Sequence, residues 1–356
     1  MKPLVLLILL IPTLLGGEEQ APAPVSSQVI RTAQQWMESS DPERRQAAYR
    51  SVQLLGKEAL PAFESALRRA LKHHETRLKD VLEGRAGSGN PYRELGTLAG
   101  ELATERERIH ALIKTDYKKD STKIRMLTDE MEGLEKSFQR AARIVEADPS
   151  ALDKAVDALA GVLVELTDQL ALFEDLESGE SDNPLDERKR IALKESFEGD
   201  AYLTDRERFA ELKKEIAGHA AADEDNAACD WANGSQQNFA KLLNQQRAVL
   251  GLAPLRLEEK LSDAATGHSS DMKSGGFFSH TSPVPGKKSP NDRANKAGFQ
   301  GRWTGENIYM GSSSHSAAYK AWFGSDGHRF IMFAQGPNLL GPGPVGGHWT
   351  LMTGRR

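Results

Sequence analysis

The chain of 356 residues contains a single cysteine, Cys229, and only 6% aromatic residues. One cysteine excludes an internal disulfide, so the core must hold by packing alone. Cys229 is then either a link between two chains or a lone thiol. Excess positive charge is also missing, because 46 Lys and Arg are outweighed by 51 Asp and Glu and the formal net charge is −5. This balance argues against nucleic acid as a partner.

Long apolar runs are absent beyond the N-terminus. The opening sequence MKPLVLLILLIPTLLGG places one lysine before an apolar run from Leu4 to Leu15, and small residues follow it. This run is too short to span a bilayer comfortably and is typical of a signal peptide, here residues 1–17. An uncleaved anchor is the alternative. The pattern predicts a protein that is secreted, periplasmic or held in the cell envelope.

Strand-forming residues are scarce between about residues 27 and 220, where charged residues, Leu and Ala dominate. The length and this composition predict more than one folded unit and an all-α region that precedes a different C-terminal domain. Residues 27–90 predict a helical segment with a weak resemblance to one HEAT-type repeat. No catalytic constellation appears in this half, so a spacer, a partner-binding coiled coil and a plain helical bundle all remain open.

Residues 91–220 contain two heptad stripes separated by Asp148-Pro149, a pair that breaks a helix. Stripes joined by so short a turn predict an antiparallel helical hairpin. A further helix is expected from Thr204, and the polar residues 221–237 predict a linker. The stripes are Ile124, Leu127, Met131, Leu134, Phe138, Ala141 and Val145, then Leu152, Val156, Leu159, Leu163, Leu166, Leu170 and Phe173.

Residues 238–356 have a different composition, richer in glycine, serine, proline and aromatics. Four stretches follow in order: NQQRAVLGLAPL (244–255), AATGHSSDM (264–272) leading to FFSHTSP, TGENIYMG (304–311) leading to AWFGSDGHR, and GGHWTLMTG (346–354). In this order they resemble the CAP superfamily, also called the SCP domain, in its bacterial branch. The resemblance covers about one third of the chain.

The resemblance implies an α+β domain in which a small antiparallel sheet lies between helical layers, an α-β-α sandwich. It also implies a cleft lined by two histidines and two acidic residues. His268 matches the cleft histidine of the HSxDM helix, Glu306 matches the acid of Gly-Glu-Asn, and His348 matches the second histidine. The fourth position is Ser325, three residues after Trp322, where an acidic residue would stand. The tetrad is therefore incomplete.

The residue pattern alone leaves two roles open for these side chains. His268 falls on the apolar side of a helix that ends at Gly275-Gly276, where a hydrogen-bonded core histidine is the ordinary outcome. Glu306 and His348 each lie in a stretch that alternates like a strand. Two imidazoles and one carboxylate would suffice for an open site for Zn²⁺ or another divalent cation. The alternative for each residue is a structural hydrogen bond.

Several further residues are expected to be structural. Ser289 and Pro290 begin a short helix that Gly298 follows, which gives Arg293 an ion-pairing or backbone-tying role. His328 and Arg329 are expected at a helix-to-loop junction, and His280 in an anchoring or rim role. Asn307 and Trp322 are assigned secondary, structural positions. Gly341, Gly343 and Gly346 have the GxGxxG spacing, but the stretch leads into a strand, so it predicts no dinucleotide loop.

Two functions follow from these observations. The first is an exported, non-enzymatic module that binds a small ligand, a lipid or a cell-envelope component at the cleft and requires no cofactor. The second is a metal-assisted hydrolase, peptidase-like, in which His268, Glu306 and His348 hold the metal and lower the pKa of bound water towards about 7. A protein partner through the helical region is compatible with both.

Overall fold

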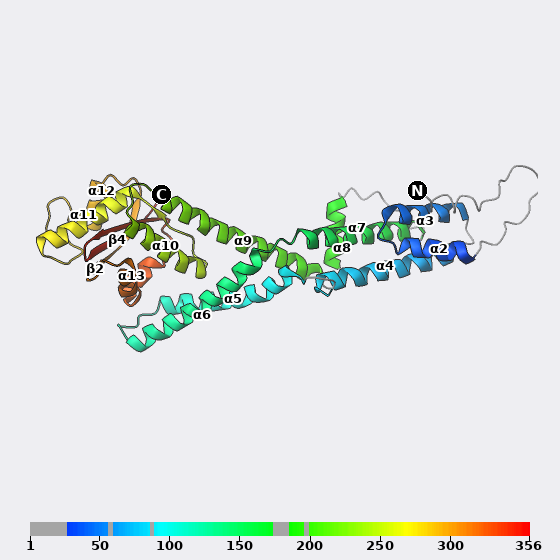
Figure 1. Ribbon diagram of the computed structural model, residues 1–356, viewed down its shortest axis with the longest axis horizontal. Helices are drawn as coiled ribbons and strands as arrows, with labels where there is room; N and C mark the ends of the chain where they lie inside the picture. The colour runs from blue at the N-terminus through cyan, green and yellow to red at the C-terminus, as the bar shows by residue number, and fades with distance from the viewer. Residues whose placement is uncertain (1–26, 56–59, 86–88, 174–184, 196–198) are drawn as a thin grey trace, which may run out of the picture. The chain divides into compact units, whose positions relative to one another are not determined.

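The computed structural model describes residues 27–55, 60–85, 89–173, 185–195 and 199–356 (Figure 1). The predicted signal peptide, residues 1–17, lies outside the described residues. Contacts divide the chain into two compact units. The first combines the residues up to Arg93 with Asp148–Thr204, and the second combines Glu94–Ala147 with Asp205–Arg356.

The first unit is helical, as the composition predicts. Its helix α7 packs along α4, and α2 packs on both α3 and α4. The helices are α2 (Ser27–Met37), α3 (Pro42–Leu55), α4 (Leu60–Leu82), α7 (Ser150–Phe173) and α8 (Leu185–Glu195). Their core is a cluster of Ala33, Met37, Ala48, Tyr49, Phe63, Ala66, Leu67, Ala70, Val162, Leu166 and Leu170.

The two heptad stripes form helices at the predicted positions, α6 (Ser121–Val145) and α7. In place of the predicted hairpin, each stripe finds its partner within its own unit. The α7 stripe packs on α4 in the first unit, whereas α6 packs with α10 (Gly234–Val249) in the second. A heptad stripe specifies that one face of a helix must be covered, but it does not specify which helix covers it.

Helix α5 spans Pro91–Ile113, and helix α9 (Gly199–Ala227) crosses the predicted segment boundary at residue 220. Helix α9 begins five residues before Thr204 and continues to Ala227, so residues 221–227 of the predicted linker are helical. Asn233 caps α10 in a capping box with Gln236, which leaves only residues 228–233 between the two helices. Composition marked this stretch as polar without showing that its first half lies on a solvated helix.

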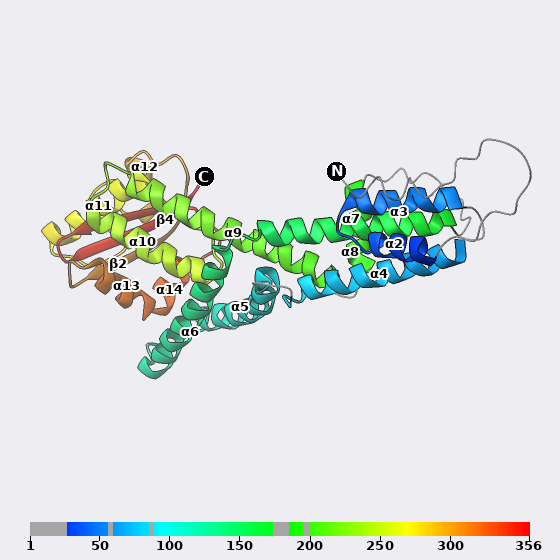
Figure 2. The same ribbon diagram turned by 45° about the vertical axis from the view of Figure 1, so that its right-hand side comes forward.

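The C-terminal part of the second unit is the α-β-α sandwich that the resemblance implies. Its sheet has the order β1-β3-β4-β2, with β1 parallel to β3 and the other neighbours antiparallel. Helices α11 and α12 lie on one side of the sheet and α10, α13 and α14 on the other (Figures 1 and 2). The elements are β1 (Arg256–Leu257), α11 (Glu259–Gly275), α12 (Pro290–Lys296), β2 (Arg302–Met310), α13 (His315–Phe323), α14 (Asp326–Met332), β3 (Leu339–Val345) and β4 (His348–Arg355).

Glycines in β3 let α11 approach the sheet closely. A Cβ on Gly341 would overlap the backbone of Leu261, and one on Gly343 would overlap the backbone at Ala265 and Thr266. The GxGxxG spacing therefore serves helix–sheet packing and not phosphate binding.

Two helix ends match their sequence signals. Helix α11 ends at Gly275 and Gly276 has a φ of 65°, which favours glycine. Helix α12 begins with a capping box between Ser289 and Asp292 and has Pro290 in its first turn. These local signals depend on neighbouring residues alone, which is why the sequence predicts them.

Helices α5 and α9 attach to the sandwich through polar side chains that bind backbone carbonyls at the end of α10 and in the loop after it. Arg106 Nε donates to the Val249 carbonyl at 2.9 Å, and His110 Nε2 lies 2.8 Å from the Leu250 carbonyl. From α9, Asn226 Nδ2 donates to the Leu255 carbonyl at 3.0 Å. The second unit is thus larger than the 238–356 domain predicted from the motifs.

Among the described residues, no helix is both long and apolar enough to cross a membrane.

Candidate functional site

Strand β2 is an edge strand, so its side chains reach both faces of the sheet at its outer margin. Neighbouring residues of a strand point to opposite faces. Glu306 contacts Arg293 of α12 on one face, and Asn307 Nδ2 donates to the His328 carbonyl of α14 on the other, at 3.0 Å. The Gly-Glu-Asn motif therefore joins the two helical layers at one point of the sheet.

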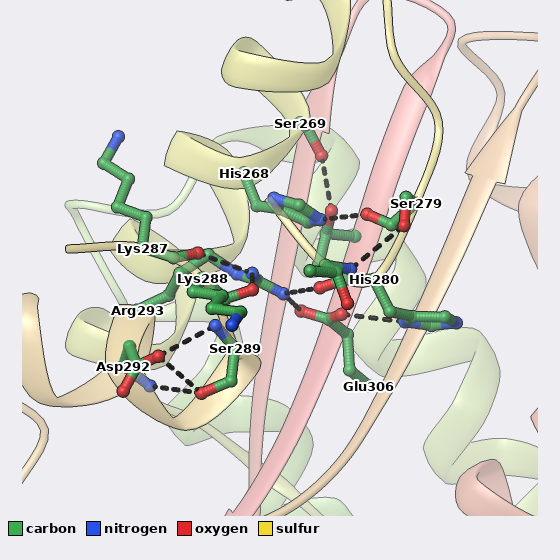
Figure 3. A network of polar contacts seen from close by, with 12 residues as sticks. His268, Ser269, Ser279, His280, Lys287, Lys288, Ser289, Asp292, Arg293 and Glu306 are labelled. Atoms are coloured by element: carbon green, nitrogen blue, oxygen red, sulfur yellow. Dashed lines mark hydrogen bonds and ion pairs between the residues drawn. The ribbon is translucent and has the colours of Figure 1, made fainter. Parts of the chain in front are cut away.

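Glu306 and Arg293 form a buried ion pair. Arg293 Nη2 lies 2.6 Å from Glu306 Oε2, and both side chains are 1% exposed. The same guanidinium donates to the carbonyls of His280 at 3.1 Å and Lys287 at 2.9 Å, so it fixes the loop between α11 and α12 (Figure 3). Removing one member of such a pair leaves an uncompensated buried charge. Arg293 thus has the ion-pairing and backbone-tying role that the sequence predicts.

The second oxygen of Glu306 holds His280. His280 Nδ1 lies 2.8 Å from Glu306 Oε1, and the His280 side chain is 49% exposed (Figure 3). A neutral imidazole that donates Nδ1–H to a carboxylate keeps Nε2 as an acceptor. The ring is oriented from the buried side and half open to solvent. It can accept a hydrogen bond from a ligand or exchange a proton with it.

His328 lies beside His280, with 6.5 Å between the ring centroids. Burial lowers the pKa of His328, and the nearby charges of His280 and Lys119 lower it further. Its Nδ1 is buried without a hydrogen-bond partner in the described part of the chain, as is Asn307 Oδ1. The two rings form one imidazole surface.

His268 is fully buried and is not part of this surface. Its Nε2 lies 3.0 Å from the Ser279 carbonyl, so this nitrogen carries the proton (Figure 3). Burial lowers the pKa of His268, and the Arg293 charge lowers it further. His268 anchors the backbone immediately before His280. His268 therefore occupies the position of a hydrogen-bonded core histidine, which was the structural alternative. It does not line the cleft as the resemblance implied.

His348 lies away from Glu306 along the sheet. The register pairs His348 with Met310 and Glu306 with Met352. The two pairs are four positions apart along β4, about 13 Å at the rise of a strand. The predicted set of His268, Glu306 and His348 is not brought together.

A divalent metal does not fit the side chains as they are arranged. Within the described ranges, no group of three or more His, Cys, Asp or Glu is placed to hold a metal ion. Both oxygens of Glu306 are engaged, one by an arginine. The positive charge that a cation would supply to Glu306 comes from Arg293.

The remaining predicted residues support the site from α13 and α14. Trp322 is buried and donates Nε1–H to the Ile308 carbonyl at 3.0 Å. Arg329 is also buried; it pairs with Asp326 at 2.6 Å and donates Nε–H to the Ile113 carbonyl at 3.1 Å. Ser325 precedes α14 and lines an open pocket described below. Arg329 thus fixes its junction as predicted and also binds the α5–α6 loop.

The sequence predicts secondary roles for His280 and His328, yet His280 contacts Glu306 and the two histidine rings lie beside each other. The available signal was that both belong to the ordered motifs, FSH and GHR, and lie next to helix ends. The family resemblance favours His268 and His348 for the cleft, whereas helical periodicity alone favours a core position for His268, because periodicity reports which face is buried. It does not report which loops return to the same strand.

Comparisons with known proteins agree with this architecture. Residues 240–341 match the model of the Cysteine-rich secretory protein family, CAP. The chain is 36% identical over 117 residues to the uncharacterized protein YkwD of Bacillus subtilis (strain 168), a match that covers 32% of this chain and 45% of YkwD. It is 34% identical over 109 residues to the uncharacterized membrane protein YlbC of the same organism, covering 31% of each.

A solved structure gives a similar match. An extracellular protein of Bacillus anthracis str. Ames that contains an SCP domain is 32% identical, with a TM-score of 0.34, and the match covers 35% of this chain and 41% of that one. The chain thus spans less than half the length of each of these relatives. Its C-terminal region is a CAP domain.

Proposed function

We propose that this CAP domain is an exported binding module, and that its ligand contacts His280 and His328 at the outer edge of β2. The observation that carries the proposal is the position of Glu306. Its carboxylate is buried and paired with Arg293, and it holds a half-exposed His280 at 2.8 Å. A ring that is already oriented loses little conformational freedom when it binds, which favours recognition.

The site supplies few parts for catalysis. His280 has the orientation of a general base, but no serine, threonine or cysteine hydrogen-bonds to its ring in the described chain. The alternative function is a metal-assisted hydrolase that uses His268, Glu306 and His348. This geometry does not support it, because the three side chains do not converge. Binding requires only ring nitrogens held at the surface, which His280 and His328 provide.

The ligand class is a component of the cell envelope. The N-terminal lysine and apolar run support export, and one relative is described as extracellular. A surface of two imidazoles suits a ligand that carries hydroxyl or anionic groups, since neutral rings accept hydrogen bonds and protonated rings donate them. An envelope polymer or a lipid headgroup presents such groups.

Co-sedimentation of the purified chain with insoluble peptidoglycan, and separately with phospholipid vesicles, tests the proposal. We expect the wild-type chain to bind one of these surfaces and His280→Ala to bind at least about tenfold more weakly. The matched control is His315→Ala, at the start of α13. Binding of neither surface by the wild type, or equal binding by His280→Ala, contradicts the proposal.

A calorimetric titration with Zn²⁺ tests the alternative function, the metal-assisted hydrolase. We expect His348→Ala to leave the zinc response of the chain unchanged, because His348 and Glu306 are far apart on the sheet. A zinc site that His348→Ala and Glu306→Gln both abolish would restore the metal-assisted hydrolase.

A further inference from the structure

The loop between α5 and α6 carries two adjacent lysines in an unusual backbone conformation. Lys118 has a φ of 49° and Lys119 a φ of 63°, and among the described residues they are the only non-glycine positions with positive φ. This backbone region is unfavourable for an L-residue other than glycine. Such a conformation persists only where surrounding contacts impose it.

Contacts with the CAP domain hold this loop. The Lys118 amide donates to Asp326 Oδ2 at 3.0 Å and to Asp116 Oδ1 at 2.9 Å. Arg329 Nη2 donates to the Thr115 carbonyl at 3.0 Å, and its guanidinium lies over the Tyr117 ring. All of these residues belong to the second unit. The loop therefore presents both lysines from a fixed backbone.

The two lysines line an open pocket of about 460 Å³ beside the start of α14. Ser325 and Phe330 contribute a hydroxyl group and an apolar wall, and Asp116 and Asp326 also line it. Both lysines are exposed, and neither ammonium group forms an ion pair with a described residue. Of the two acids that line the pocket, Asp326 is already paired with Arg329 at 2.6 Å. The negative charge of Asp116 therefore stands against the positive charges of two lysines.

We infer that this pocket binds a phosphate group, with Lys118 and Lys119 as the cations and the Ser325 hydroxyl as a hydrogen-bond donor. Two neighbouring ammonium groups match a group that carries up to two negative charges, and charge-assisted hydrogen bonds to such a group are strong. The positive charge of Lys119 also acts on His328. The pocket thus adds a second subsite beside the His280 surface, and it does not depend on the role proposed for His280.

Calorimetric titration of the full chain with pyrophosphate at low salt tests the inference. The informative variant is Lys118→Gly with Lys119→Gly, because glycine accepts the positive φ angles while both charges are lost. We expect this double variant to bind pyrophosphate at least about tenfold more weakly than the wild type. Lys118→Arg with Lys119→Arg keeps the charges and should retain binding.

Lys213→Ala with Lys214→Ala is the matched control, an exposed adjacent pair on α9 in the same unit. It should bind as the wild type does. No pyrophosphate binding by the wild type, or equal binding by the Lys118/Lys119 glycine variant, overturns the inference. His280→Ala should leave pyrophosphate binding unchanged, so failure of this inference and failure of the proposed function are separable.

Vesicles of phosphatidylglycerol and of neutral phosphatidylcholine identify the source of the phosphate. Sedimentation with phosphatidylglycerol alone, lost in the glycine variant, assigns the pocket to a lipid headgroup. Pyrophosphate binding without vesicle binding assigns it to a phosphate group outside a membrane.

Discussion

The two units of this chain are held together in different ways. In the first, an apolar cluster of Ala, Leu, Met, Val, Phe and Tyr side chains fills the core between α2, α3, α4 and α7. The second unit has an apolar cluster of its own, around Leu261, Phe299 and Met352. In addition, its buried arginines Arg247, Arg293 and Arg329 each bind backbone carbonyls outside their own helix. Apolar packing tolerates volume-conserving exchange, whereas a buried ion pair fails when one of its two side chains is lost.

Arg293→Ala is the variant expected to damage the second unit most. It leaves the Glu306 carboxylate buried without its partner, which costs about 3–5 kcal/mol of unfolding free energy. Chemical denaturation followed by tryptophan fluorescence measures this loss. Arg356→Ala is the control, since Arg356 pairs with Glu258 from a half-exposed position, and we expect a change below about 1 kcal/mol. Similar values for the two variants would mean that the buried pair of Arg293 and Glu306 contributes no more than a partly exposed one.

Trp322→Ala tests the apolar packing of the sandwich. Trp322 is buried, its ring meets Phe239 at 5.5 Å, and its Nε1–H is bonded to the Ile308 carbonyl. We expect a loss of about 3–5 kcal/mol in the unfolding free energy. A near-neutral result in the same denaturation experiment would mean that α13 does not pack on the sheet as described.

Acid should weaken the first unit through His74. His74 is fully buried, and this burial lowers its pKa to about 4, although a backbone hydrogen bond to Met37 opposes the shift. The charges of His73, Arg77 and Arg45 lower this pKa further. The folded state thus disfavours the protonated ring, so the contribution of His74 is fully present above pH 6.5 and is lost as the pH falls from about 6.5 towards 4.

The size of this effect is about 3 kcal/mol at most, since one pKa unit corresponds to 1.36 kcal/mol. Thermal melting between pH 7 and pH 4.5 measures it, and His74→Leu should flatten the pH dependence of the first unit. His315→Ala, in the second unit, serves as the control. A pH profile unchanged by His74→Leu would show that His74 is not the acid-sensitive group.

The smallest expected effect concerns a helix cap. Ser289 Oγ accepts a hydrogen bond from the Asp292 amide at 3.2 Å and Asp292 Oδ2 accepts one from the Ser289 amide at 2.9 Å. Ser289→Ala should destabilise the second unit by about 1 kcal/mol. Because α12 carries Arg293, this variant should also weaken ligand binding slightly. A loss as large as that of Arg293→Ala would mean that the cap controls the whole site.

Local signals made much of the fold predictable. The ends of α11 and α12, the strands around Glu306 and His348, and the layered sandwich follow from glycine, proline and capping residues together with the ordered motifs. The partners of α6 and α7 did not follow, because a heptad stripe has no information about which helix covers it.

The candidate site was predictable in part, for a related reason. Glu306 and Arg293 were singled out, but His268 was placed on the cleft and His280 on its rim. In the structure, the carbonyl of Ser279 binds His268 inside the core and thereby positions the next residue, His280, at the surface. The path of the loop after α11 therefore determines that His268 is buried and His280 is at the surface. The spacing of residues along a helix contains no information about that path.

Comparing His280→Ala with His348→Ala tests the central claim most directly. Both histidines belong to the motifs that resemble the CAP family, but only His280 contacts Glu306. The measurement is the dissociation constant of the full chain for whichever envelope surface the wild type binds. We expect a loss of at least about tenfold for His280→Ala and a change below about twofold for His348→Ala. A loss confined to His348→Ala would contradict it.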